Sequence, residues 1–241
     1  MKQRLSKVMA AAGVASRRAC EELIFAGCVK VNGKKADLPQ TMVDPEEDII
    51  KVKGKTIKRA PKRVYYAVHK PVGYVCTSAP QVKKRAVDLV ETDLRLFTIG
   101  RLDKETSGLI LLTNDGHFAH RIMHPSGGVK KEYIAKVDRE ITHEHLTCLS
   151  QGCYVQNVLV RPVSVKKVRR ATIRIVVQEG RYHEVRELLA AVGLTTIELK
   201  RVRIGGLSLG KLAPGSWKLL EPGEIDKIFP EPKSGKQTEI K

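Results

Sequence analysis

The sequence predicts an α+β fold in two parts, a small N-terminal unit of helices and strands and a larger mixed α+β domain built on a largely antiparallel sheet. Two patterns support this prediction. Residues 1–57 show two helical patterns followed by short strands. Later in the chain, strand-like runs follow one another with only occasional helical patterns between them. A parallel sheet would require stricter alternation of strands and helices.

The N-terminal unit is predicted from local signals. Apolar residues recur at helical spacing over residues 4–12, and Ser16 is a good N-cap for a second short helix. Residues 29–31 alternate as a strand does and run into an Asn-Gly dipeptide at 32–33, which readily forms a tight hairpin turn. Residues 48–52 form a further expected strand. The predicted order of elements in this unit is therefore helix, helix, hairpin and strand.

A basic segment separates the two parts. Residues 51–63 contain seven Lys or Arg and show little apolar periodicity after Ile57. This composition is typical of an interdomain linker. We therefore expect a folded unit at 1–57, a basic linker at 58–63, a larger domain at 64–229 and a flexible tail at 230–241.

The larger domain contains six strand-like runs and two helical patterns. One helix is expected to begin at about His117, and the other spans residues 183–192 with its apolar side chains on one face. The expected strands are residues 64–68, 97–99, 109–113, 132–137, 164–168 and 172–177.

Net charge indicates the class of partner. The chain carries 44 Lys and Arg against 26 Asp and Glu, a formal net charge of +18, yet 42% of its residues are hydrophobic. A folded protein with so large a positive excess is expected to bind a polyanion. Nucleic acid is the first candidate and an anionic membrane surface the second.

Several other classes are not favoured. No apolar stretch approaches the roughly 20 residues needed to cross a bilayer. The five cysteines form no Cys-x-x-Cys pair, so neither a disulfide framework nor a zinc ribbon is indicated, and a cytoplasmic protein is expected. His117, His120 and His124 have helical spacing but lack further ligands, so no metal site is expected. Neither an ATP nor a dinucleotide fingerprint is present.

The segment GRLDKETSGLILLTNDG at residues 100–116 is the most informative in the chain. A polar loop bounded by glycine leads into an apolar run of strand length, so Asp103 is expected to project from a loop anchored by buried strands. Catalytic groups often occupy such loops. Taken alone, an aspartate there is more often a residue that stabilises a turn.

Together with other segments, this motif resembles the catalytic signature of the pseudouridine synthases, in the RsuA-type branch that acts on ribosomal RNA. The resemblance covers about residues 64–229 and implies that family's fold and activity. The further similar segments, in order, are His69-Lys70-Pro71-Val72-Gly73, Lys131-Glu132-Tyr133, residues 179–186 (EGRYHEVR), Arg203-Ile204-Gly205-Gly206 and Leu212-Ala213-Pro214-Gly215.

The resemblance implies roles for individual residues. Asp103 takes the position of the family's catalytic nucleophile or base, and Arg186 that of its cationic partner, since a nearby cation favours an ionised carboxylate. Tyr133 takes the position of the ring that stacks on the flipped base. Arg101 is expected to hold a phosphate or help extrude the base. For His183 the alternatives are orienting a loop, touching RNA or a structural role.

Lys70 and Lys131 are further candidates for phosphate contacts, although in so basic a chain either can be bystander charge. Because the reaction involves neither net redox change nor a group donor, no cofactor is expected.

The N-terminal unit resembles the small RNA-binding domain of ribosomal protein S four. The similar segments are Arg4-Leu5, residues 13–17 (GVASR) and residues 29–33 (VKVNG). This resemblance favours RNA over a membrane as the partner. The expected RNA contacts are Ser16, Asn32 and a set that we call the N-terminal basic residues, namely Arg4, Lys7, Arg17, Arg18, Lys30 and Lys34.

The sequence thus predicts a monomeric enzyme that isomerises a uridine of ribosomal RNA. It does not indicate the ribosomal subunit or the uridine. The alternative from another class is a ribosome-assembly factor that binds RNA without catalysis. A DNA-binding regulator is a third reading, but the sequence lacks a convincing recognition helix.

Overall fold

The computed structural model describes residues 1–230 and divides the chain into two units. The first unit comprises residues 1–64 with the short segments 92–96 and 114–116. The second comprises residues 65–91, 97–113 and the chain from 117 onward. Residues 231–241, most of the expected tail, lie outside the described residues.

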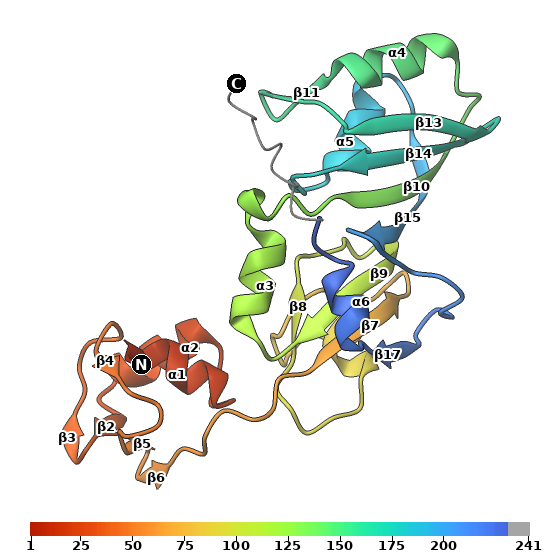
Figure 1. The fold of residues 1–241 in the computed structure, drawn as a ribbon. Coiled ribbons are helices and arrows are strands. Elements are labelled where there is room, and N and C mark those ends of the chain that lie inside the picture. Colours follow the sequence, from red (N-terminus) through yellow and green to blue (C-terminus); the bar gives the residue numbers. More distant parts are fainter. Residues whose placement is uncertain (231–241) are drawn as a thin grey trace, which may run out of the picture. The chain divides into compact units, whose positions relative to one another are not determined.

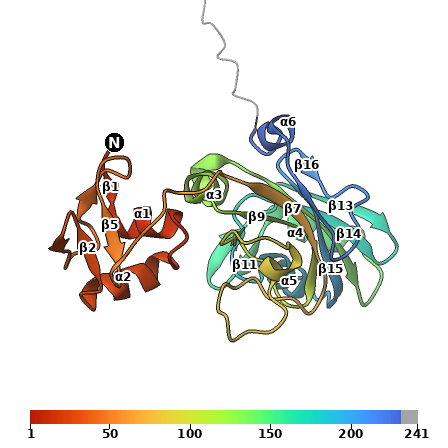
Figure 2. The same cartoon turned by 90° about the horizontal axis from the view of Figure 1, so that it is seen from below.

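The first unit packs two short helices against small sheets (Figures 1 and 2). Ser16 caps the second helix, because its hydroxyl accepts a hydrogen bond from the Ala19 amide at 3.1 Å. The hairpin turns at Asn32 and Gly33, which both have positive φ angles, as its tight turn requires. The elements are β1 (Gln3–Arg4), α1 (Leu5–Ala11), α2 (Arg17–Phe25), β2 (Val29–Val31), β3 (Lys34–Lys35), β4 (Met42–Val43), β5 (Ile50–Val52) and β6 (Lys55–Thr56).

The first unit has its own hydrophobic core. Leu5 and Met9 of α1 and Ile24 of α2 are fully buried, and Val29 of β2 lies beneath them. The apolar stripes of the two helices thus face the strands, which leaves their basic side chains exposed.

The second unit is built on a sheet in the order β13-β14-β10-β15-β9-β7-β17, with β16 added beside β15 and β8 beside β9. Every pairing is antiparallel except that of β15 with β9 at the centre of the sheet. The strands are β7 (Tyr65–Lys70), β8 (Phe97–Ile99), β9 (Thr106–Thr113), β10 (Lys131–Val137), β13 (Ser164–Arg169), β14 (Thr172–Val177), β15 (Thr196–Ile204), β16 (Leu207–Ser208) and β17 (Trp217–Leu219).

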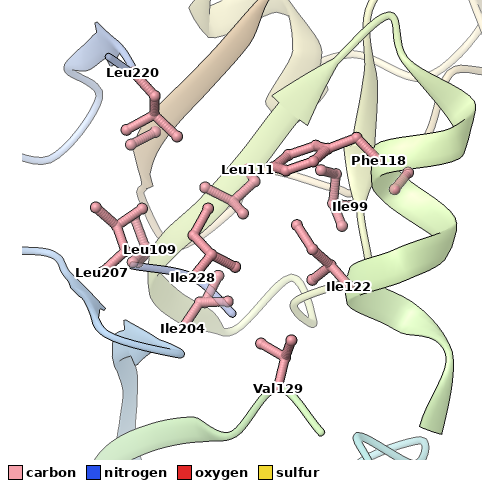
Figure 3. Close-up of a cluster of buried hydrophobic side chains, with 12 residues drawn as sticks. Ile99, Leu109, Leu111, Phe118, Ile122, Val129, Ile204, Leu207, Leu220 and Ile228 are labelled. Carbon is pink, nitrogen blue, oxygen red and sulfur yellow. The ribbon is translucent and has the colours of Figure 1, made fainter. Parts of the chain in front are cut away.

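Helices pack at both ends of this sheet. α4 contacts β13, and α5 contacts β15 and the small hairpin of β11 with β12. At the other end, Phe118 and Ile122 of α3 pack on Leu109 and Leu111 of β9 (Figure 3). The remaining elements are α3 (Gly116–Met123), α4 (His143–Gln151), β11 (Cys153–Val155), β12 (Val158–Val160), α5 (Glu184–Ala191), α6 (Pro222–Asp226) and 3-10 turns at Ala86–Leu89 and Pro125–Gly127.

The predicted fold class, α+β with a largely antiparallel sheet, is confirmed. Several elements were not predicted, among them α4 and the central strand β15. β15 lies between β10 and β9, where it brings Arg201 opposite Tyr133. α4 buries only Leu149, so its sequence carries almost no apolar periodicity.

Candidate active site

The loop between β8 and β9 presents Asp103 and is fixed by backbone hydrogen bonds. The Gly73 amide donates to the Lys104 carbonyl at 2.8 Å, and the Thr106 amide donates to the Asp103 carbonyl at 3.0 Å. The Leu102 amide donates to the Cys76 sulfur at 3.3 Å. Because both flanking strands belong to the central sheet, the Asp103 carboxylate projects from a rigid support.

The Asp103 side chain is 29% exposed and has two close neighbours. His183 Nε2 lies 3.3 Å from its Oδ1 atom, and the Thr106 hydroxyl donates to its Oδ2 atom at 3.4 Å. His183 thus has the position expected of a residue that orients the carboxylate. It is also the N-cap of α5 and has a φ of +53°, a left-handed conformation that is uncommon for histidine.

Arg186 does not form the expected direct ion pair with Asp103. Its Nη2 atom donates instead to the Glu105 carbonyl at 3.2 Å and to the Thr106 hydroxyl at 3.5 Å. The same hydroxyl donates to Asp103. Arg186 therefore ties α5 to the loop that carries Asp103 and reaches the carboxylate through Thr106.

The segment between β14 and α5 is held by two charged side chains of opposite sign, the half-buried Lys131 and the buried Glu184. The Lys131 ammonium donates to the carbonyls of Gln178 and Glu179 at 3.0 and 2.7 Å. The Glu184 carboxylate accepts from the amides of Gly180 and Arg181 at 2.6 and 2.8 Å. A cation on the carbonyls and an anion on the amides fix both polarities of the backbone just before His183.

Burial shifts the pKa of both Lys131 and Glu184. Removal from water lowers the pKa of Lys131 and raises the pKa of Glu184, because burial disfavours the charged form of each. The two amide hydrogen bonds partly oppose the shift at Glu184. Lys131 was predicted to contact phosphate, but in this structure its ammonium binds the chain itself.

Tyr133 and Arg201 face each other across β10 and β15, and both are buried, at 8% and 3% exposed. Arg201 Nη1 donates to the Tyr133 hydroxyl at 3.4 Å, and its Nε donates to the Leu109 carbonyl at 2.7 Å. Gly108 of β9 permits this arrangement. A Cβ atom there would lie 2.2 Å from the Arg201 carbonyl oxygen, so another residue would push β15 away.

These side chains line one cavity of about 510 Å³. Asp103, His183, Tyr133, Arg201 and the exposed Arg101 all contribute to its wall. The volume is in the range of sites that hold one small organic molecule. A carboxylate, a buried aromatic ring and a guanidinium around it suit a planar, polar ring such as a nucleobase.

Lys70 lies elsewhere than predicted. Its side chain is 0% exposed, and its ammonium donates to the carbonyls of Pro71, Tyr74 and Lys104 at 2.9, 2.8 and 3.5 Å. This desolvation lowers the pKa of Lys70. With no atom at the surface, Lys70 cannot contact a phosphate in this structure. It supports the Asp103 loop from beneath.

Among the expected RNA contacts of the first unit, some side chains are exposed and others are already hydrogen-bonded within the chain. All of the N-terminal basic residues are exposed. Ser16 is occupied by its capping hydrogen bond. The Asn32 side chain donates to Asp48 at 2.7 Å and accepts from the Ile49 amide at 2.9 Å, so it holds the hairpin to β5.

Sequence reasoning missed two features of the cavity. It left the role of His183 open and gave none to Arg201. The only sequence signal for Arg201 is an arginine at an inward position of a strand, and the strand itself was not predicted. Within residues 1–230, no cluster of three or more His, Cys, Asp or Glu side chains is placed to bind a metal, and no helix is long and apolar enough to span a membrane.

Comparison with protein families matches both units. Residues 64–191 match the model of the RNA pseudouridylate synthases, and residues 3–49 match the S4 domain. A putative ribosomal large subunit pseudouridine synthase of the Arabidopsis thaliana chloroplast is 50% identical over 86% of this chain. The alignment covers 55% of that plant protein, which is therefore considerably longer.

Bacterial relatives match over nearly their whole length. Ribosomal large subunit pseudouridine synthase B of Bacillus subtilis is 37% identical, and the alignment covers 94% of this chain and 95% of that protein. An uncharacterized RNA pseudouridine synthase of Aquifex aeolicus is 39% identical, with 95% and 94% covered.

Among solved structures, a crystal structure of a pseudouridylate synthase superposes with a TM-score of 0.70 at 26% identity. The superposition covers 93% of this chain and 99% of the other. With a family match over more than half of its residues and relatives similar along its length, this chain belongs to the RNA pseudouridylate synthase family and carries an N-terminal S4 domain.

Proposed function

We propose that this protein isomerises a specific uridine of large-subunit ribosomal RNA to pseudouridine, with Asp103 as the reacting carboxylate. The observation that carries the proposal is the single cavity lined by Asp103, Tyr133 and His183. Its wall contains both a partly exposed carboxylate and a buried aromatic ring, the two features that the reaction on an extruded base requires.

The names of two relatives support ribosomal RNA as the substrate. The Bacillus subtilis and Arabidopsis thaliana proteins are both named as ribosomal large subunit pseudouridine synthases. The bacterial relative also has nearly the length of this chain. The formal net charge of +18 and the exposed N-terminal basic residues agree with a polyanionic substrate.

The isomerisation requires an ionised carboxylate but neither an oxidant nor a group donor. The bond from base nitrogen 1 to ribose carbon 1′ breaks, the base turns, and a bond forms from carbon 5 to the same ribose carbon. Carbon 5 then loses its proton and nitrogen 1 gains one, so atoms and electrons balance without an oxidant or a group donor. An ionised carboxylate can attack the nucleotide or remove a sugar proton.

Each side chain of the cavity has a part in this proposal. Tyr133 receives the face of the flipped uracil, and Arg101 at the cavity wall contacts the RNA backbone or helps to extrude the base. His183 orients Asp103 at 3.3 Å. Arg186 supplies positive charge near the carboxylate and positions its loop through Glu105 and Thr106.

The N-terminal basic residues supply affinity for RNA phosphates, which does not depend on base sequence. We propose that the protein acts as a monomer. We propose the cytoplasm as the compartment, although the name of the Arabidopsis thaliana relative assigns that protein to the chloroplast.

Pseudouridine mapping tests the proposal directly. Both ribosomal RNAs are mapped in cells that lack the protein and in the same cells supplied with the wild type, Asp103→Asn or Glu105→Gln. We expect one large-subunit site to disappear, to return with the wild type and with Glu105→Gln, and to stay absent with Asp103→Asn. Loss of a catalytic carboxylate is expected to slow the reaction by at least about 1,000-fold.

Glu105→Gln is the matched control, because it removes an exposed carboxylate from the same loop. If no site changes on deletion, or if Asp103→Asn restores the site as well as the wild type does, the catalytic proposal fails. The alternative of an assembly factor that only binds RNA would then be favoured. A site that disappears from small-subunit RNA would retain the reaction and correct the substrate.

A further inference from the structure

Among the described residues that line the cavity, Arg201 is distinguished by a terminal side-chain nitrogen that is buried without a hydrogen-bond partner. Its Nη2 atom is buried and makes no hydrogen bond to any described residue. Its Nε donates to the Leu109 carbonyl, and Nη1 lies 3.4 Å from the Tyr133 hydroxyl and 3.5 Å from the Arg101 carbonyl. Buried donors are nearly always paired, because an unpaired one costs free energy. We therefore expect the unpaired Nη2 atom to donate a hydrogen bond to an acceptor on a bound ligand.

The position of Arg201 Nη2 indicates which kind of ligand accepts its hydrogen bond. Arg201 lines the cavity, and its guanidinium carbon lies 5.9 Å from the centre of the Tyr133 ring. A base stacked on Tyr133 would present an edge to the guanidinium at that side. Edge contacts to a stacked base are the usual way in which a flipped nucleotide is identified.

Depth favours an atom of the base over a phosphate oxygen as the acceptor. The present partners of Arg201 are two carbonyls and a phenol, so its Nη2 atom lies among uncharged groups. Arg101 is the exposed arginine of the same cavity and is better placed for the hydrated backbone. The depth of Arg201, only 3% exposed, suits the uncharged base.

Depth also selects the edge of the base. Asp103 must reach the sugar or the bond at nitrogen 1, and its side chain is 29% exposed. Carbon 4 lies across the ring from nitrogen 1. With the sugar at Asp103 near the entrance, the carbon 4 edge enters deepest, where Arg201 lies.

We propose that Arg201 Nη2 donates a hydrogen bond to the carbonyl oxygen at carbon 4 of the flipped uracil and thereby selects uridine over cytidine. This inference rests on the proposed function. A guanidinium has donors only. Cytosine carries an amino group at carbon 4, so two donors would meet and both would lose their partners. A mismatch of this kind discriminates more strongly than a change in size does.

The test uses single-turnover kinetics on an RNA that contains the mapped target site, with uridine, 4-thiouridine or 2-thiouridine at the target. Sulfur accepts hydrogen bonds more weakly than oxygen. For the wild type we expect 4-thiouridine to react about 10-fold more slowly and 2-thiouridine at close to the normal rate. Arg201→Lys is expected to slow the reaction of uridine by about 10- to 100-fold and to lose the 4-thiouridine penalty.

The loss of that penalty separates recognition from a merely structural role, which would slow all three RNAs alike. Arg203→Lys is the matched control, since Arg203 is an exposed arginine on the same strand whose partner is Glu132. It should keep both the wild-type rate and the 4-thiouridine penalty.

Two outcomes overturn the inference alone: an active wild type that is insensitive to 4-thiouridine, or an Arg201→Lys variant that retains the penalty. A wild type that does not convert the uridine RNA overturns the proposed function as well. Thermal unfolding shows whether Arg201→Lys is folded. If it is not, the comparison of 4-thiouridine with 2-thiouridine on the wild type decides, and a larger effect of 2-thiouridine would contradict the contact at carbon 4.

Discussion

The first unit and the cavity of the second unit use charged side chains in opposite ways. The N-terminal basic residues are exposed and take part in no ion pair among the described residues. Lys70, Lys131, Glu184 and Arg201 are buried or half-buried, and each binds backbone atoms of its own chain. Charges of the first kind act through their sum and are individually replaceable. Those of the second kind fix atoms in place, so each is expected to matter alone.

The largest effect predicted by this comparison concerns Lys70. Replacing it by methionine leaves up to three carbonyls without their donor inside the second unit. We expect Lys70→Met to lower the free energy of unfolding by about 3 kcal/mol. Denaturant unfolding measures this change. Lys104→Met, an exposed lysine nearby, should change it by less than about 0.5 kcal/mol.

The pH dependence of stability offers a second readout for Lys70. Burial lowers the pKa of Lys70 from its ordinary value of 10.5, so between the lowered pKa and 10.5 the unfolded chain binds more protons. The contribution of Lys70 to stability is therefore fully present above 10.5 and is lost as the pH falls through the lowered pKa. Lys70→Met should lack this rise. An equal rise in both proteins would contradict the burial of the ammonium.

Arg186 is the next test, because it positions a loop that carries a reacting group. Without it, the Glu105 carbonyl and the Thr106 hydroxyl lose the bond to α5 that steadies Asp103. A displacement of about 1 Å can cost about 100-fold in rate, and we expect that loss in kcat for Arg186→Met with KM changed much less. Arg186→Lys should recover part of the rate. A rise in KM alone would assign Arg186 to RNA binding.

The features that could be predicted from the sequence are those encoded by neighbouring residues. The cap at Ser16 and the turn at residues 32–33 are encoded by neighbouring residues, and the structure has both. β15 could not be predicted in this way. Its pairing with β10 shifts register between Glu132 and Tyr133, and Arg201 occupies an inward position, so the alternation of apolar residues is broken.

The same reasoning applies to the candidate site. The resemblance of motifs suggested Asp103, Tyr133 and Arg186, and the structure brings them to one region. The partner of Asp103 could not be read from the sequence, because His183 reaches it only through the packing of α5 against the sheet. Arg201 breaks the local rule for a strand. Violations of local rules tend to occur at functional sites, and the cavity here follows that tendency.

The smallest predicted effect belongs to the first unit and tests the other half of the comparison. Arg17 begins α2 and is exposed, so a phosphate contact there contributes one charge among several. We expect Arg17→Gln to weaken RNA binding by only about 2- to 3-fold near physiological salt and to reduce the slope of log affinity against log salt by about 1. Arg17→Lys keeps the charge and should retain both values. If Arg17→Lys loses as much affinity as Arg17→Gln, the guanidinium makes a specific contact, and the two units differ less in their use of charge than the structure suggests.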